Sequence, residues 1–233
     1  MATIKVAGFQ ANSFVDWPEK IASVVFLGGC NLRCHYCHNH NILGTTSNTI
    51  PLAEVLAQLR DQLGFTDGAV LTGGEPTLHP HLREIIAEIR ALGLPIKLDT
   101  NGTNATLLKA LINENLVDYV AMDIKGPLKK YPDITSAKPQ AIAEIKKSLE
   151  FLKTQTNVDY MFRLTLSPML TEADIRETAR LVSGAKTFQL QQFVPNDYSN
   201  SHRTVHLPYT PAQAEKLAAH IAPHVTNFLM RGF

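Results

Sequence analysis

Short apolar segments rich in β-forming residues alternate along this chain with segments whose apolar residues recur at helical spacing. The predicted strands are 21–27, 69–71, 95–98, 119–124, 160–166 and 188–193, with a last short strand over 225–229. The predicted helices are 51–63, 81–92, 105–115, 140–154, 171–182 and 211–222. Such alternation is typical of parallel strands joined by right-handed crossovers, and six repeats fall short of the eight in a closed barrel. The sequence therefore predicts an α/β protein with a partial (β/α)6 barrel.

The domain organisation follows from length and composition. The 233 residues contain no linker or low-complexity segment, and 45% of them are apolar, enough for a sizeable core. We therefore expect a single domain over 1–233, in which 1–20 form an N-terminal strand or hairpin that caps the barrel. The only tryptophan, Trp17, lies in this segment and is expected to be a packing residue.

The charges are nearly balanced, with 22 Lys and Arg against 21 Asp and Glu and a net charge of +1. This balance gives no reason to expect binding to nucleic acid or to a membrane surface. No segment approaches the roughly 20 apolar residues of a membrane-spanning helix, and the N-terminus lacks the apolar run of a signal peptide. We expect a cytoplasmic protein, because reducing conditions suit free thiols.

All three cysteines of the chain lie in the segment 30–37, as Cys30, Cys34 and Cys37. An odd number in a chain of this length argues against a disulfide framework. Cysteine thiolates hold iron–sulfur clusters, and a cubane of four irons usually takes four of them, so three would leave one iron open to a small molecule. The alternative is a Cys3His zinc site, whose fourth ligand would be one of the nearby histidines. Those histidines are His35, His38 and His40.

Polar residues follow or end the predicted strands, where barrels of this kind place their active sites. After the cysteine segment these are Gly73-Gly74-Glu75-Pro76, Asp99-Thr100-Asn101-Gly102, Met122-Asp123-Ile124-Lys125, Arg163, and the pair Gln189 and Gln191 on one face of a strand. Because six segments converge on one rim, the sequence predicts a single site there.

Simple chemistry assigns roles to some of these residues. Gly73 and Gly74 would let the backbone approach a ligand closely, although a tight turn would also use them. Asp99 and Asp123 lie at the ends of neighbouring strands, where two carboxylates repel unless a cation or donor lies between them. Asp99 could instead form a turn. Lys125 is placed to be a counter-charge to a carboxylate.

The loop after the sixth predicted strand carries His202 and Arg203. It should lie at the mouth of the predicted cleft. These two side chains are therefore candidates for contact with a partner protein.

The cysteine spacing and the Gly-Gly-Glu-Pro segment resemble the motifs of radical S-adenosylmethionine (SAM) enzymes. Within that superfamily the chain resembles the activating proteins of anaerobic (class III) ribonucleoside-triphosphate reductases, and it is similar in plan to pyruvate formate-lyase activating enzymes. The segments that carry the resemblance are 8–10, 13–18, 24–39, 97–102 and 117–125.

Two positions depart from the pattern of these activases. Glu19 stands where the segment Asp-Trp-Pro-Gly-Lys would have glycine, which affects the local turn. The segment 189–195 also differs from formate-lyase activases, so the resemblance assigns no ribose or adenine contacts there.

The resemblance implies a reaction. Cys30, Cys34 and Cys37 would hold a [4Fe–4S] cluster whose open iron chelates SAM through its amino and carboxylate groups. A flavodoxin- or ferredoxin-type donor would supply one electron, and SAM would split into methionine and a 5′-deoxyadenosyl radical. That radical would remove a Cα hydrogen from a glycine of the class III reductase.

The resemblance also implies roles for individual residues. The Gly-Gly-Glu-Pro segment, with Glu75 as an acceptor, would hold the SAM amino group, and Lys125 would pair with the SAM carboxylate. Asp99, Thr100, Met122 and Asp123 resemble a monovalent-cation site for K⁺ or Na⁺. The remaining expected cofactor contacts are Tyr36, His38, Asn39, Gly73, Gly74 and Arg163.

Two other functions stay open. One is a radical SAM enzyme that acts on a small molecule, such as 7-carboxy-7-deazaguanine synthase, which would need a pocket closed around its substrate. The other is a zinc or iron–sulfur module without catalytic activity.

Overall fold

The computed structural model describes residues 4–44, 49–195 and 207–233. Its main element is an eight-stranded sheet in the order β10-β9-β8-β7-β6-β5-β3-β2. The strands are β2 (Gly8–Trp17), β3 (Lys20–Leu27), β5 (Gly68–Gly73), β6 (Ile96–Thr100), β7 (Tyr119–Asp123), β8 (Asp159–Leu166), β9 (Thr187–Gln192) and β10 (Asn227–Arg231). From β3 to β10 neighbouring strands are parallel, and β2 pairs antiparallel with β3. A separate antiparallel pair joins β1 (Lys5–Val6) to β4 (Ile50–Pro51).

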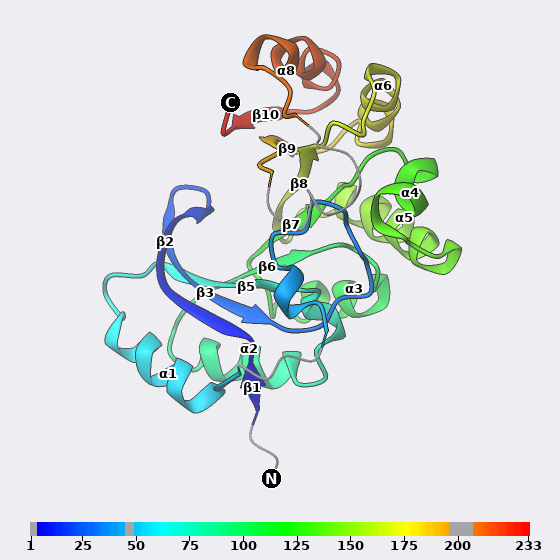
Figure 1. The fold of residues 1–233 in the computed structure, drawn as a ribbon. Helices are drawn as coiled ribbons and strands as arrows, with labels where there is room; N and C mark the ends of the chain where they lie inside the picture. The colour runs from blue at the N-terminus through cyan, green and yellow to red at the C-terminus, as the bar shows by residue number, and fades with distance from the viewer. Residues whose placement is uncertain (1–3, 45–48, 196–206) are drawn as a thin grey trace.

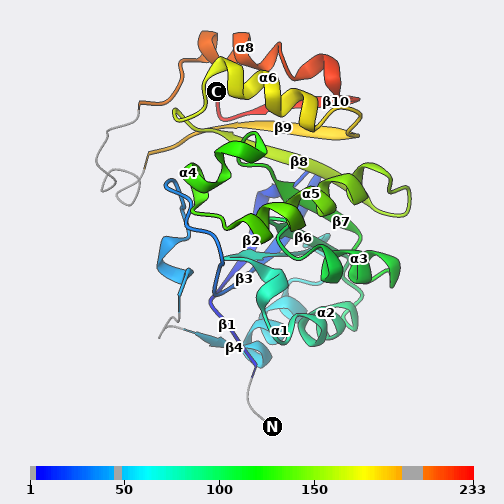
Figure 2. The same ribbon diagram turned by 90° about the vertical axis from the view of Figure 1, so that its right-hand side faces the viewer.

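Helices cover the outer face of the curled sheet (Figures 1 and 2). The α-helices are α1 (Leu52–Asp61), α2 (Leu82–Arg90), α3 (Ala105–Asn113), α4 (Tyr131–Thr135), α5 (Pro139–Lys153), α6 (Glu172–Leu181) and α8 (Pro211–Ala218). Short 3-10 turns are η1 (His40–Ile42), η2 (Pro76–Leu78), η3 (Leu128–Lys130) and η4 (Ala222–His224). The predicted partial barrel is confirmed, and the helix α4 was not predicted. In the described part of the chain, no helix is both long and apolar enough for a bilayer span.

The core lies between the sheet and the helices, as the helical spacing predicts. In α2 the residues Leu82, Ile85, Ile86 and Ile89 are all buried in the main core cluster. The helix α6 begins with a capping box in which Thr171 and Asp174 each bond the other's backbone N–H, which satisfies donors that a helix start leaves unpaired.

Strand β6 is longer than the sequence predicts. Asp99 and Thr100 belong to the strand and pair with Ala121 and Met122 of β7, whereas we expected them to follow it. The extension is possible because the inward-pointing Asp99 carboxylate meets basic partners inside the barrel.

The N-terminal segment extends one edge of the sheet. Strand β3 runs back along β2 after a tight turn in which Glu19 has a φ of 61°. This left-handed conformation favours glycine, the residue expected at this position from the resemblance. Trp17 is buried in a small cluster with Ala22, Val24 and Val70, so its expected packing role is confirmed.

The barrel stays open between its two edge strands. Strands β2 and β10 end the sheet order and face each other across the open side in Figure 1. Among the described residues, a hydrogen bond crosses this side: the Arg231 guanidinium donates to the Val15 carbonyl oxygen at 2.6 Å. The interior is therefore bounded there by side chains and not by a strand ladder.

Candidate active site

A cavity of about 210 Å³ lies at the carboxyl ends of the parallel strands. It brings together most of the residues singled out from the sequence. These are Cys30, Cys34, Tyr36, Cys37, His38, Asn39, Gly73, Gly74, Asp99, Thr100, Asp123, Lys125, Arg163 and Gln191. The predicted convergence of six strand-end segments on one rim is confirmed.

The cysteine segment directly follows β3 and is held by hydrogen bonds to backbone carbonyl groups. Gly29 N–H donates to the Ile42 carbonyl at 2.8 Å, and the Arg33 guanidinium donates to the Cys30 carbonyl at 2.6 Å. Burial raises the pKa of all three cysteine thiols. These thiols would lose their protons on binding a metal.

The donor set fits a cluster better than a single ion. Three thiols line one cavity, yet no three His, Cys, Asp or Glu side chains of the described residues converge on one metal-ion position. A cubane gives each thiolate its own iron, so its ligands surround a volume instead of a point. The His35 Nε2 atom lies 2.8 Å from the Asp133 carbonyl oxygen and is thus already engaged.

Tyr36 brings a buried hydroxyl to this cavity. Its ring packs edge-on against Phe193, and the Lys125 ammonium lies 5.8 Å from the ring centre. Burial raises the pKa of the Tyr36 hydroxyl. The oxygen has no hydrogen-bond partner among the described residues. A polar ligand in the cavity would remove the cost of this unpaired group.

Gly73 and Gly74 hold the end of β5 against the cysteine segment. Gly73 has a φ of 112°, and a Cβ atom on Gly74 would collide with the Gly29 carbonyl oxygen. The Asn39 side-chain amide donates to the Gly73 carbonyl at 2.9 Å. Both glycines line the cavity, but the close approach they allow is first of all between two segments of the protein.

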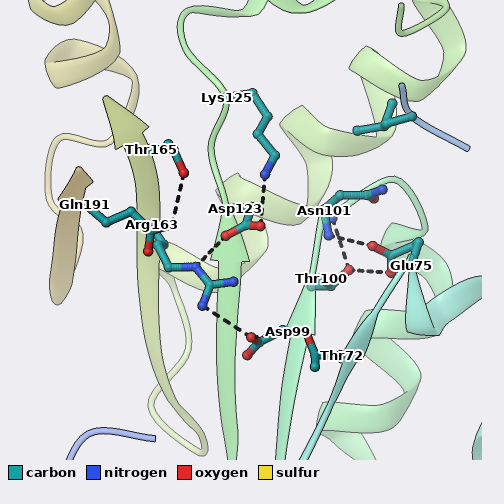
Figure 3. Close-up of polar contacts among 12 residues, drawn as sticks. Thr72, Glu75, Asp99, Thr100, Asn101, Asp123, Lys125, Arg163, Thr165 and Gln191 are labelled. Atoms are coloured by element: carbon teal, nitrogen blue, oxygen red, sulfur yellow. Dashed lines mark hydrogen bonds and ion pairs between the residues drawn. The ribbon is translucent and has the colours of Figure 1, made fainter. Parts of the chain in front are cut away.

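Glu75 is not among the residues that line the cavity, and its expected contact with the SAM amino group stays a prediction. Its fully buried carboxylate accepts from the Thr77 N–H at 3.0 Å and the Thr77 hydroxyl at 2.5 Å. It also accepts from the Thr100 hydroxyl at 2.7 Å and the Asn101 N–H at 2.6 Å (Figure 3). Burial raises the pKa of this carboxyl, and the donors oppose that effect. The carboxylate thus joins the segments that follow β5 and β6. Without it, the backbone donors of these segments would be buried and unpaired.

An ion-pair network crosses the base of the cavity (Figure 3). Arg163 donates through Nε to Asp123 at 2.6 Å and through Nη1 to Asp99 at 3.2 Å. Lys125 lies 2.9 Å from Asp123, so the expected pairing of this lysine with a carboxylate is observed. Lys97 pairs with Asp99 and is almost completely buried.

This network shifts the pKa values of its members. Burial alone raises the pKa of Asp123, but the charges of Arg163 and Lys125 outweigh it and hold that pKa well below its usual range. Burial lowers the pKa of Lys125, and Asp123 reverses this effect and raises it above the ordinary value. Burial lowers the pKa of Lys97 despite its pairing with Asp99.

Thr100 and Met122 are paired neighbours in the ladder between β6 and β7. The Thr100 hydroxyl points to Glu75, and the buried Met122 side chain lies beside Gly102 and does not line the cavity. Alternation along the strands puts these two side chains on the face opposite Asp99 and Asp123. Side chains of the four residues expected at a cation site are therefore divided between the two faces of the sheet.

Gln189 and Gln191 share one face of β9, as predicted. Gln189 donates to Gln191 at 3.3 Å, and Gln191 donates to the Thr165 hydroxyl at 3.0 Å. Gln191 lines the same cavity as the three cysteines, whereas Gln189 lines a separate pocket beside Lys97.

Sequence reasoning missed several members of the site, namely Leu32, Leu43, Thr72 and Thr165 on the cavity wall and Lys97 below it. A signal for Lys97 was present: a lysine two residues before Asp99 in a buried strand must share its face. His202 and Arg203, the expected partner contacts, lie outside the described residues.

Known proteins resemble this chain over most of its length. A model of the radical SAM superfamily matches residues 24–182. A Methanocaldococcus jannaschii protein, provisionally named a glycyl-radical enzyme activating enzyme, is 34% identical over 210 residues, which cover 87% of this chain and 86% of that protein. The pyruvate formate-lyase-activating enzyme of Clostridium pasteurianum is 26% identical over 200 residues, with coverage of 82% and 81%.

The fold is also found among solved structures. The crystal structure of QueE from Escherichia coli superposes with a TM-score of 0.54 at 14% identity, covering 99% of this chain and 95% of that one. This likeness concerns the arrangement of strands and helices alone.

Proposed function

This chain belongs to the radical SAM superfamily, and from that premise we propose that it activates a glycyl-radical enzyme. The observation that carries the proposal is the joining of Cys30, Cys34 and Cys37 with Gly73 and Gly74 on one open cavity. The similarity to a protein named a glycyl-radical enzyme activating enzyme supports the class of acceptor.

The cavity residues fit a bound [4Fe–4S] cluster and SAM. The three thiols would hold the cluster, and its cofactor chemistry would supply the 5′-deoxyadenosyl radical. Lys125, kept charged by Asp123, would pair with the SAM carboxylate, as its place on the cavity wall allows. The buried Tyr36 hydroxyl would gain a partner from the same ligand.

His38 and Asn39 follow the last cysteine and would enclose the ligand on that side. Asn39 is already fixed by its bond to the Gly73 carbonyl, so it would also hold the glycine pair in position. Arg163 and Asp99 form the base of the cavity and would exclude water from the reacting groups.

The proposed acceptor is a glycine in a class III anaerobic ribonucleotide reductase, and the proposed electron donor is of the flavodoxin or ferredoxin type. A protein substrate must present its glycine on an extended loop. The open side between β2 and β10 would admit such a loop, because no strand ladder closes it.

The test is to mix the reconstituted protein with the class III reductase, SAM and a strong reductant under anaerobic conditions. We expect a glycyl doublet in the electron paramagnetic resonance spectrum, and its loss when the radical glycine of the reductase is replaced by alanine. Pyruvate formate-lyase serves as a second acceptor. A doublet that forms only with the lyase would make the lyase, and not the reductase, the partner. Turnover of 6-carboxytetrahydropterin without any doublet would favour a small-molecule enzyme.

A further inference from the structure

We infer that Arg163 is a built-in counter-ion that takes the place of the monovalent cation expected from the resemblance to formate-lyase activases. The guanidinium lies between the two carboxylates that such a cation would join, Asp99 and Asp123. The inference concerns the same site as the proposed function, but it does not depend on which substrate the enzyme uses.

Asp123 has no carboxylate oxygen left without a cationic donor. Its Oδ1 atom accepts from Arg163 Nε at 2.6 Å. Its Oδ2 atom accepts from Lys125 Nζ at 2.9 Å. A metal ion at either oxygen would have to compete with a fixed positive charge.

Asp99 is occupied in the same way. Its Oδ1 atom accepts from the Lys97 ammonium, and its Oδ2 atom accepts from Arg163 Nη1 at 3.2 Å. The Thr72 hydroxyl is a further neighbour of Oδ2 at 3.4 Å. The two carboxylates therefore offer four oxygens, and each of them already has a basic partner.

Burial makes this arrangement hard to displace. The Lys97 side chain is 1% exposed, that of Asp99 8% and that of Arg163 16%. Charges interact strongly where water is excluded. Each oxygen of the two carboxylates already has a basic partner, so an added K⁺ or Na⁺ would have to displace a buried cation. The Met122 side chain lies on the other face of the sheet, beside Gly102, so it offers no ligand to a cation between Asp99 and Asp123.

The first experiment uses the full chain with its cluster reconstituted. Its thermal unfolding midpoint and its affinity for SAM are measured in potassium, sodium and choline chloride at equal ionic strength. We expect the same values in all three salts, because a cation that bound only the folded state would raise the midpoint. A saturable rise in potassium or sodium relative to choline would overturn the inference.

The second experiment removes the guanidinium. Arg163→Ala leaves one oxygen of Asp99 and one oxygen of Asp123 without a cationic donor, and we expect the midpoint in choline to fall by about 6–20 °C. Potassium or sodium should restore part of this loss and part of the affinity for SAM. Adding Asp123→Asn to this variant should abolish the salt-specific effect, since one carboxylate is then neutral.

The matched control is Arg176→Ala, which breaks an exposed ion pair with Glu172 far from the cavity. It should lower the midpoint little and equally in all salts. If Arg163→Ala does not fold, Arg163→Lys takes its place, because a single ammonium cannot bridge both carboxylates. A loss of stability in the folded variant that no cation reduces would refute the assigned role of Arg163.

Discussion

The Glu75 carboxylate accepts a hydrogen bond from the Thr100 hydroxyl at 2.7 Å. This contact joins the segment after β5 to the end of β6, so two neighbouring parts of the cavity rim are fixed to each other. Both residues are buried, and the carboxylate faces protein donors instead of the cavity. The position of the two rim segments relative to each other thus depends on a side chain that bonds to protein groups.

Glu75→Ala should destabilise the fold by at least about 3 kcal/mol, because it leaves several buried donors unpaired. Glu75→Gln should cost less, since one amide oxygen can still accept. Urea unfolding measures both values. The control Glu84→Ala removes an exposed carboxylate and should change stability little. A fully stable Glu75→Ala protein with weakened SAM binding would show that the carboxylate contacts the ligand, as the family resemblance implies.

Gly74→Ala should push the cysteine segment away from β5, because the added Cβ meets the Gly29 carbonyl oxygen. We expect a loss of about 1–3 kcal/mol in stability and a reduced iron content after reconstitution. Gly44→Ala is the control, since a Cβ there meets nothing within 4 Å. Equal iron content in the two variants would contradict the close packing at Gly74.

Each of Cys30→Ala, Cys34→Ala and Cys37→Ala should abolish SAM cleavage, because the chain has no further cysteine to replace the ligand. Iron and sulfide analysis of the wild-type protein should approach about four of each per chain. His35→Ala and His40→Ala should keep that iron content. A colourless protein that contains zinc and loses it in a histidine variant would favour the Cys3His site.

Asp123 should make the free energy of unfolding depend on pH in the acid range. Its pKa is lower in the folded chain than the unfolded value of about 3.9, so the folded state gains stability above that pH and loses it as the pH falls. At neutral pH the wild type should exceed Asp123→Asn by about 3 kcal/mol in unfolding free energy. Urea unfolding of the cluster-free chain at decreasing pH should show this difference shrinking below about pH 4. A constant difference would mean that the carboxylate is not held ionised by its neighbours.

Glu19→Gly should stabilise the turn between β2 and β3. Glu19 has a φ of 61°, a conformation that strains a residue with a Cβ atom. Part of the gain is offset by the greater freedom of glycine in the unfolded chain, so we expect about 0.5–1 kcal/mol. Thermal unfolding measures the change. Lower stability of the glycine variant would show that the Glu19 side chain makes a contact worth more than the strain.

The order of strands and helices was predictable because it rests on local periodicity. Residues such as Ile85 and Ile89 recur at helical spacing and are buried as a single face of α2. The end of β6 was not predictable in this way, because Asp99 and Thr100 are polar and favour a turn. Asp99 continues the strand because Arg163 of β8 meets its carboxylate inside the barrel. The Thr100 hydroxyl bonds Glu75 on the opposite face.

The sequence by itself determined the chemistry available to this protein: three thiols, a glycine pair and a set of acidic and basic side chains at successive strand ends. The tertiary structure decided which of these groups bond to one another. Asp99 and Arg163 are 64 residues apart in the chain and meet across β7. Glu75 turns towards protein donors while Asp123 faces the cavity. Such choices depend on strand order, register and side-chain direction, because a charge placed in the interior is stable only next to the particular partners that these features bring to it.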